Sequence, residues 1–171
     1  RELAACLTEI HWTRPDNLHL TLKFLGDVPE TELAGVCRAV RLAVADQDPL
    51  EIECACLGAF PSQDRPRTLW VGIRQGEDLL RTLQEQIDER LTQHGFPPER
   101  RRFHGHLTIG RISRRKDLTA DQLALVKGII EREQDSESVM MMVDEVITFS
   151  SFLNSEGRVY QPIDHARLGT I

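Results

Sequence analysis

The stretch that most constrains the fold is residues 17–24 (NLHLTLKF), in which apolar and polar side chains alternate strictly. A period of two predicts a half-buried strand with its polar side chains on one face. The polar positions are His19, Thr21 and Lys23, and the apolar positions are Leu18, Leu20, Leu22 and Phe24. The sequence His-Leu-Thr returns at 106–108, inside a second alternating stretch at 103–112 (FHGHLTIGRI). The fold must therefore accommodate two similar strands that carry the same polar motif.

Amphipathic helices and further strands fill the rest of the chain. Apolar residues at helical spacing, preceded by Pro29 and by acidic Glu30 and Glu32, predict a helix at 29–46. Similar patterns predict helices at 77–93 and 119–133. Strands are expected at 50–57, 68–73, 139–142, 146–149 and 158–161, with a loop at 58–66. Because strands and helices do not alternate regularly, this order indicates an α+β or mixed α/β fold, and no linker divides it.

Composition excludes several classes of protein. The chain has 171 residues, of which 40% are hydrophobic and 28% charged, as expected for a globular domain. No apolar run approaches the roughly 18 residues of a membrane span, and no signal-peptide pattern opens the chain, so we expect a cytoplasmic protein. Four cysteines are too few for a disulfide framework, so we expect reduced thiols. We expect both Cys54 and Cys56 in the core.

The charge distribution is more informative than the net charge of −6, which argues against coating of long nucleic acids. Residues 100–116 contain seven basic side chains and no acidic one. A local basic patch on an acidic body suits a small anion or the end of a polyanion, and a solvated arginine-rich turn is the alternative. The basic residues are Arg100, Arg101, Arg102, Arg111, Arg114, Arg115 and Lys116.

The two copies of His-x-Thr predict chemistry at phosphorus. In a strand, each histidine lies beside its own threonine on one face. If the two strands are neighbours or pseudo-symmetric partners, two imidazoles and two hydroxyls converge. Imidazole groups titrate at about pH 6.5, so one ring can accept a proton while the other donates one. Threonine hydroxyls can donate hydrogen bonds to phosphate oxygens. A single copy of the motif is commonplace on a polar strand face, whereas the repetition favours in-line displacement at phosphorus without metal.

Other residues carry weaker hypotheses. His104 and His106 could form a metal-binding pair, but the neighbouring side chains are arginines, so His104 is expected to flank the site or to be exposed. Lys23 shares the face of His19 and could add positive potential there. Strand alternation directs Arg111 away from His106 unless the strand twists or ends at Gly110. The aromatic rings of Phe60 and Trp70 could stack on an RNA base, with core packing as the alternative role.

The stretches 19–26 (HLTLKFLG) and 106–111 (HLTIGR) resemble the motifs of the two-histidine (LigT-like) phosphoesterases. Within that superfamily they resemble the branch of RNA 2′,3′-cyclic phosphodiesterases and 2′-5′ RNA ligases. Softer matches occur at 58–61 (GAFP), at 67–70 (RTLW) and at 151–153 together with Gly157 and Tyr160. The similarity therefore covers nearly the whole chain from Ile10 onwards.

The resemblance implies one bilobal, pseudo-symmetric domain over residues 1–171, with antiparallel-rich sheets around a central cleft, helices outside and one motif from each lobe. It implies hydrolysis of RNA 2′,3′-cyclic phosphate ends to 2′-phosphomonoesters, with no metal and no cofactor, by a monomer that binds no membrane. By motif position, His19 would be the proton donor and His106 the proton acceptor. Thr21 and Thr108 would hold the phosphate. Lys23, Arg111, His104 and Phe60 are the candidate further substrate contacts.

Two departures and three rival functions stay open. The family normally has a strand and most of a helix before the segment that corresponds to residues 1–7 (RELAACL), so we expect either that the sequence is trimmed there or that a strand of one lobe is absent. Gly105 stands where the family usually has proline, which loosens the backbone before His106. The same two histidines could catalyse the reverse reaction, 2′-5′ ligation. The chain could instead be a non-catalytic RNA-end binding module, with steeply salt-dependent affinity. A metal-dependent hydrolase built on His104 and His106 is the third rival.

Overall fold

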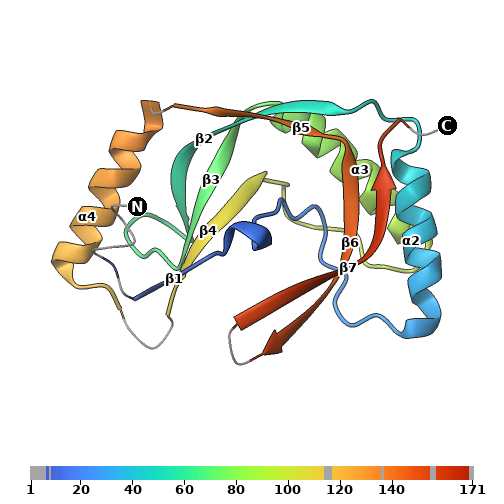
Figure 1. Cartoon of the computed structure of the whole chain (residues 1–171), viewed down its shortest axis with the longest axis horizontal. Coiled ribbons are helices and arrows are strands. Elements are labelled where there is room, and N and C mark those ends of the chain that lie inside the picture. The colour runs from blue at the N-terminus through green and yellow to red at the C-terminus, as the bar shows by residue number, and fades with distance from the viewer. Residues whose placement is uncertain (1–6, 8, 114–116, 136, 155–156, 170–171) are drawn as a thin grey trace. The chain divides into compact units, whose positions relative to one another are not determined.

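The computed structural model describes residues 7, 9–113, 117–135, 137–154 and 157–169 (Figure 1). The chain divides into two compact units. Unit 1 comprises Arg1–Thr21, Glu53–Gln75 and Gly105–Met140, and unit 2 comprises Leu22–Ile52, Gly76–His104 and Met141–Ile171. No helix among the described residues is long and apolar enough to cross a membrane. That the two units together form one bilobal domain stays a prediction.

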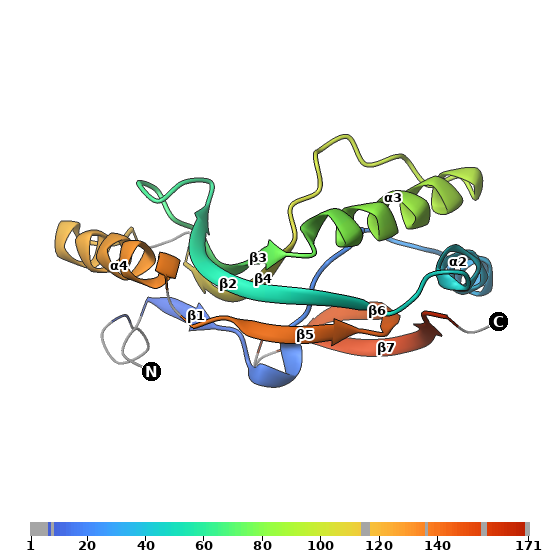
Figure 2. The ribbon, with the colours of Figure 1, turned by 90° about the horizontal axis from the view of Figure 1, so that it is seen from above.

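Strands pair mainly antiparallel, as expected for the α+β class. A five-stranded sheet has the order β1-β4-β3-β2-β5, and its β1–β4, β4–β3 and β3–β2 pairs are antiparallel. A separate hairpin pairs β6 with β7 (Figure 2). The strands are β1 (Ile10–Trp12), β2 (Leu50–Phe60), β3 (Thr68–Gln75), β4 (His106–Ile112), β5 (Val139–Val143), β6 (Glu145–Asn154) and β7 (Gly157–Arg167).

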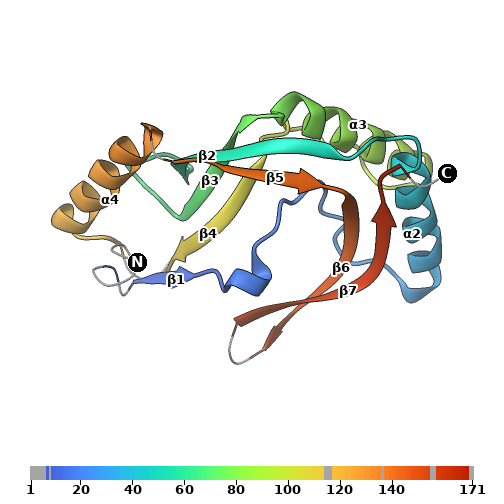
Figure 3. The same cartoon turned by 45° about the horizontal axis from the view of Figure 1, so that its top comes forward.

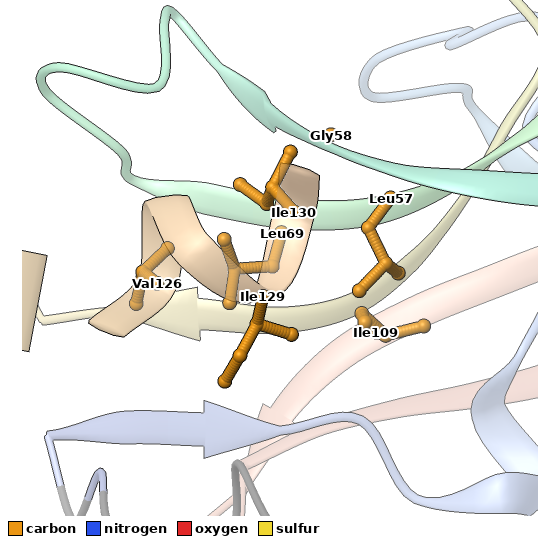
Figure 4. A pocket seen from close by; sticks show the side chains of 7 residues that line it. All are labelled: Leu57, Gly58, Leu69, Ile109, Val126, Ile129 and Ile130. Carbon is orange, nitrogen blue, oxygen red and sulfur yellow. The ribbon is translucent and has the colours of Figure 1, made fainter. Parts of the chain in front are cut away.

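The core of unit 1 lies between its strands and helix α4 (Ala120–Arg132). Thr119 caps this helix, because its side chain accepts a hydrogen bond from the Gln122 backbone and the Gln122 side chain accepts one from the Thr119 backbone. The buried side chains of the cluster are Leu7, Ile10, Ala59, Leu69, Ile112, Val126 and Ile130. A small apolar pocket lies between α4 and the strands, lined by side chains that include Leu57, Leu69 and Ile109 (Figure 4).

Unit 2 has its own core, in which helices α2 (Glu30–Val44) and α3 (Glu77–Gln93) pack with the end of β7 (Figure 3). The predicted helices at 29–46, 77–93 and 119–133 are confirmed to within two residues. The apolar stripe that predicted α3 is buried, with Leu83 and Leu91 each 1% exposed. Amphipathic periodicity located these helices accurately because burial of one stripe is what stabilises them.

The predicted strand at 17–24 is wrong over most of its length. Only Leu20 forms a bridge, with Leu107, and residues 15–17 form a short 3₁₀ turn. Leu22 and Leu25 both pack against the core of unit 2, so the alternation breaks there. Phe24 is 81% exposed, contrary to its predicted burial. An alternating sequence states which side chains share a face, but a strand also needs a partner along its whole length.

Other strand boundaries differ from the predicted ones, because strand ends depend on long-range pairing. Strand β2 continues to Phe60 through the predicted loop, β4 begins at His106 instead of Phe103, and β6 and β7 extend beyond the predicted 146–149 and 158–161. The three-residue strand β1 was not predicted. Short strands carry too little periodic signal to be recognised before their partners are known.

The cysteine prediction is half correct. Cys37 and Cys54 are buried free thiols, and burial raises the pKa of both. Cys56 is only half-buried, because a register shift between Ala55 and Leu57 places it in a bulge with φ +63°. Its thiol lies 3.5 Å from the carbonyl oxygen of Gln134. Cys6 lies outside the described residues.

Candidate active site

The two His-x-Thr motifs meet at one antiparallel bridge. Leu20 pairs with Leu107, the middle residue of each motif. Continuing this register by one residue on either side sets His19 opposite Thr108 and Thr21 opposite His106. Side chains directly opposite one another project from the same face, and diagonal neighbours lie about 7–8 Å apart. If the register continues in this way, His19 and His106 are diagonal neighbours with room for a phosphate group between them, and this arrangement stays a prediction.

Both motifs lie in unit 1. The pairing of Leu20 with Leu107 ties the first motif to the same sheet as the second. That each lobe contributes one motif stays a prediction. His19, Thr21, His106 and Thr108 are all half-buried. Partial burial strengthens hydrogen bonds and charge interactions while leaving the groups accessible. The geometry therefore gathers both imidazoles and both hydroxyls in one unit.

A backbone hydrogen bond orients the ring of His19. Its Nδ1 lies 2.8 Å from the carbonyl oxygen of Asn17. A carbonyl only accepts, so Nδ1 carries the proton and donates it to this bond. The exchangeable proton of the imidazolium form is then the one on Nε2. The local turn at 15–17 thus fixes both the orientation and the tautomer of the ring.

A bulge in β4 decides where Arg111 points. Thr108 pairs with Trp70 and Gly110 pairs with Leu69, so two steps on β4 match one step on β3. Ile109 and Ile112 consequently both pack against the core of unit 1, although they are three residues apart. The alternation has changed phase, and Arg111 projects from the side opposite to Ile112. That side, which also carries His106, Thr108 and Trp70, is called the site face below.

The bulge therefore overturns the simple alternation that directed Arg111 away from His106. A bulge adds one residue to one strand and resets its alternation. Arg111 Nη1 lies 3.5 Å from the hydroxyl oxygen of Thr68, its pairing partner on β3. Of the other basic residues at 100–116, Arg100, Arg101 and Arg102 belong to unit 2 and are exposed. Arg114, Arg115 and Lys116 lie outside the described residues.

Aromatic rings surround His106 on the site face. The Phe60 ring meets the imidazole edge to face, with centroids 5.0 Å apart, and the Trp70 centroid is 6.3 Å from it. Phe60 and Trp70 also contact each other at 5.1 Å. Such contacts hold the imidazole in one orientation. Packing against His106 is thus the role that the structure gives both rings, and base stacking by Phe60 stays a prediction.

Gly58 makes room for the Trp70 ring. A Cβ atom added at Gly58 would lie 2.2 Å from Cζ2 of Trp70. We expect Gly58→Ala to displace the indole, to lower the free energy of unfolding by about 1–3 kcal/mol and to lower kcat, because Trp70 contacts both Phe60 and His106. Urea unfolding and initial rates test this prediction.

Gly35→Ala is the matched control for that substitution. Gly35 lies inside α2, and an added Cβ there would meet no atom within 4 Å. Alanine in a helix interior is favoured over glycine by up to about 1 kcal/mol, so this variant should be as stable as the parent or more so. Equal stability and equal kcat for both variants would contradict the packing role of Gly58.

Lys23 and His104 belong to unit 2. The Lys23 side chain is 6% exposed, and its ammonium forms an ion pair with Asp88 and donates to the Pro97 carbonyl at 2.8 Å. A substrate contact by Lys23 stays a prediction. His104 is exposed, and its Nδ1 lies 3.1 Å from Glu77 Oε1.

The metal pair of His104 and His106 stays a prediction, with His104 at the end of a unit 2 segment and His106 near the start of a unit 1 segment. In the part of the chain that the structure describes, no three histidine, cysteine or acidic side chains gather as metal ligands would.

The sequence analysis missed two residues of the site face, namely His11 and Thr68. No local signal marks them, because their positions beside Arg111 depend on the pairing of β1 and β3 with β4.

Comparison with known proteins identifies the family. The model of the 2′-5′ RNA ligase superfamily matches residues 11–150. An RNA 2′,3′-cyclic phosphodiesterase of Aeropyrum pernix is 36% identical over 148 residues, which cover 86% of this chain and 80% of the relative. A protein of the same name from Methanothermobacter thermautotrophicus is 34% identical over 160 residues, or 94% of this chain and 83% of the relative.

Solved structures show the same fold. Protein TT0787 of Thermus thermophilus matches with a TM-score of 0.72 and 21% identity, over 98% of this chain and 87% of that one. E. coli LigT complexed with 3′-AMP matches with a TM-score of 0.72 and 21% identity, over 95% and 83%. The fold is therefore the LigT-like α+β fold of the two-histidine phosphoesterases, as expected. With the family model and the relatives taken together, the chain belongs to the 2′-5′ RNA ligase superfamily.

Proposed function

We propose that this protein hydrolyses RNA 2′,3′-cyclic phosphate ends to 2′-phosphomonoesters. The observation that carries the proposal is the isolated bridge between Leu20 and Leu107, which brings the segment of the first His-x-Thr motif beside strand β4, which carries the second. The names of the relatives support the same reaction, since those from Aeropyrum pernix, Aquifex aeolicus and Methanothermobacter thermautotrophicus are RNA 2′,3′-cyclic phosphodiesterases.

The proposed reaction needs one base and one acid. His106 accepts a proton from water as the water oxygen forms a bond to phosphorus. The bond between phosphorus and the 3′ oxygen breaks, and His19 gives that oxygen a proton from Nε2. The products are a free 3′-hydroxyl and a 2′-phosphomonoester. The hydrogen bond from His19 Nδ1 to Asn17 keeps Nε2 as the donating atom throughout.

The threonines supply the remaining interactions. The hydroxyls of Thr21 and Thr108 flank the imidazoles across the bridge, where they can donate to the non-bridging phosphate oxygens. Hydrogen bonds from positioned donors stabilise the charge that develops on these oxygens in the transition state. Arg111 projects from the same face but pairs with Thr68, further along the strands than Thr108 and His106. The assignment of His19 as acid and His106 as base comes from the family motif.

The reverse reaction, 2′-5′ ligation, uses the same two histidines in exchanged roles. Hydrolysis is favoured by the names of the relatives and by the abundance of water as a nucleophile.

We further propose that the protein acts as a monomer in the cytoplasm. The buried free thiols of Cys37 and Cys54 agree with a reducing compartment.

Phosphorus NMR tests the proposed reaction directly. An oligonucleotide with a 2′,3′-cyclic phosphate end is incubated with the protein in excess EDTA. We expect the cyclic-phosphate resonance to be replaced by that of a 2′-phosphomonoester at an undiminished rate. A 3′-phosphomonoester product would contradict the assigned leaving group, loss of turnover with EDTA would indicate a metal-dependent hydrolase, and binding without turnover would indicate an RNA-end binding module.

A further inference from the structure

A row of three polar side chains crosses the site face beside the two motifs. His11 of β1 pairs with Arg111 of β4, and Arg111 pairs with Thr68 of β3. Residues that pair directly in an antiparallel sheet project from the same face, so the three side chains are neighbours. The 3.5 Å approach of Arg111 Nη1 to the Thr68 hydroxyl agrees with this placement. These three residues are called the His11 row.

The groups of the His11 row suit an anion. The guanidinium offers several N–H donors in a planar fork, and the imidazole and the hydroxyl can each donate one more hydrogen bond. Arg67, just before β3, forms an ion pair with Asp117. Arg74, on β3, forms an ion pair with Glu53. Arg111, in contrast, approaches the neutral hydroxyl of Thr68. Its charge is therefore available to a ligand on this face.

The position of the row relative to the motifs points to a second phosphate. On β3, Thr68 lies two residues from Trp70, which pairs with Thr108, and four residues from Gly72, which pairs with His106. At about 3.3 Å per residue, the row is displaced along the strands by about 7 Å from the level of Thr108 and by about 13 Å from the level of His106. A phosphate held between the two histidines would lie between those two levels, which leaves the row for another group of the same strand.

We infer that the His11 row is a second anion subsite, which binds the phosphodiester on the 5′ side of the terminal nucleotide. The inference rests on the proposed function and refines it, because it makes an RNA chain the preferred substrate over a cyclic mononucleotide. A cyclic mononucleotide has one phosphate, which the motif residues hold. Only a longer substrate has a second phosphate for His11 and Arg111 to contact.

Three substrates test this subsite. They are a dinucleotide with a 2′,3′-cyclic phosphate end, the same dinucleotide with a neutral methylphosphonate linkage, and a cyclic mononucleotide. A hydrogen bond to a charged group contributes enough that we expect kcat/KM to be about tenfold higher for the natural dinucleotide than for its methylphosphonate analogue. The slope of log kcat/KM against log salt concentration should be steeper by about 0.7 for the natural linkage.

The variant His11→Gln connects the effect to the row. We expect the ratio between the two dinucleotides to fall from about tenfold to about threefold or less, with a smaller difference in salt slope. His165→Gln is the matched control, because His165 is an exposed histidine of β7 that contacts Glu145 in unit 2. This control should retain both the rate and the ratio of the parent.

Each outcome decides between the two proposals. If the parent protein hydrolyses none of the three substrates, the proposed function fails and the subsite fails with it. If the parent hydrolyses both dinucleotides equally well, the subsite is overturned and the proposed function stands. A tenfold ratio that persists in His11→Gln overturns the role of His11. The comparison of the natural and methylphosphonate dinucleotides with the parent protein tests the subsite even if His11→Gln does not fold.

Discussion

Alanine at position 19 or 106 is expected to lower kcat on a cyclic-phosphate-ended oligonucleotide by roughly 10²–10⁴-fold, the usual contribution of a general acid or base. Each substitution removes a proton-transfer group from the site formed around the bridge of Leu20 and Leu107. Both side chains are only half-buried, so we expect the variants to fold. Initial rates at saturating substrate, with thermal unfolding as the check on folding, measure the effect.

The pH dependence of kcat/KM identifies which histidine is the base. A base works only when it has lost its proton, so its titration gives the limb on which the rate rises with pH. An acid works only when protonated, so its titration gives the limb on which the rate falls. The parent enzyme should show both limbs. His106→Ala should lose the rising limb, and His19→Ala should lose the falling limb. The opposite pattern would exchange the two roles.

Two further variants test whether the large loss of kcat is specific to His19 and His106. Thr21→Val preserves the shape of the side chain and removes one hydrogen-bond donor, so its effect on kcat should be milder than that of either histidine. His94→Ala changes a residue at the C-terminal end of α3, outside the site face, and should leave kcat unchanged. Turnover that survives both His19→Ala and His106→Ala would disprove the two-histidine mechanism.

Prediction from the sequence worked best where the signal was local. The pair of His-x-Thr motifs was visible because both copies are short, alike and placed in alternating stretches. The helix α3 was located to the residue because its apolar stripe repeats over its whole length. Each copy of the motif, like each part of the stripe of α3, is defined by residues that are close together in the chain.

Features that depend on pairing between distant segments were not predictable. The orientation of Arg111 depends on the bulge that lets Thr108 and Gly110 pair with consecutive residues of β3. The alternation at 17–24 predicted the wrong environment for Phe24, since the chain passes from unit 1 to unit 2 after Thr21, and the shared face of His19 and Thr21 stays a prediction. Such features arise from long-range register, which a single sequence does not display.

The division into two units leads to a prediction that separates stability from catalysis. Leu83 is 1% exposed in the core of unit 2, whereas every residue of the proposed mechanism lies in unit 1. We expect Leu83→Ala to lower the free energy of unfolding by about 2–5 kcal/mol, because it leaves a cavity in a packed core. The kcat per folded molecule should nevertheless stay within about twofold of the parent. Urea unfolding and active-site-normalised rates at low temperature measure the two quantities.

Leu69→Ala is the matched substitution in unit 1. Leu69 is 3% exposed, so the loss of stability should be similar. It lies between Thr68 and Trp70 and pairs with Gly110 at the bulge of β4, so a cavity there disturbs the strands that position His106 and Arg111. We therefore expect Leu69→Ala to lower kcat per folded molecule by at least tenfold, while Leu83→Ala does not. Equal losses of kcat in the two variants would show that catalysis depends on unit 2 as strongly as on the site face of unit 1.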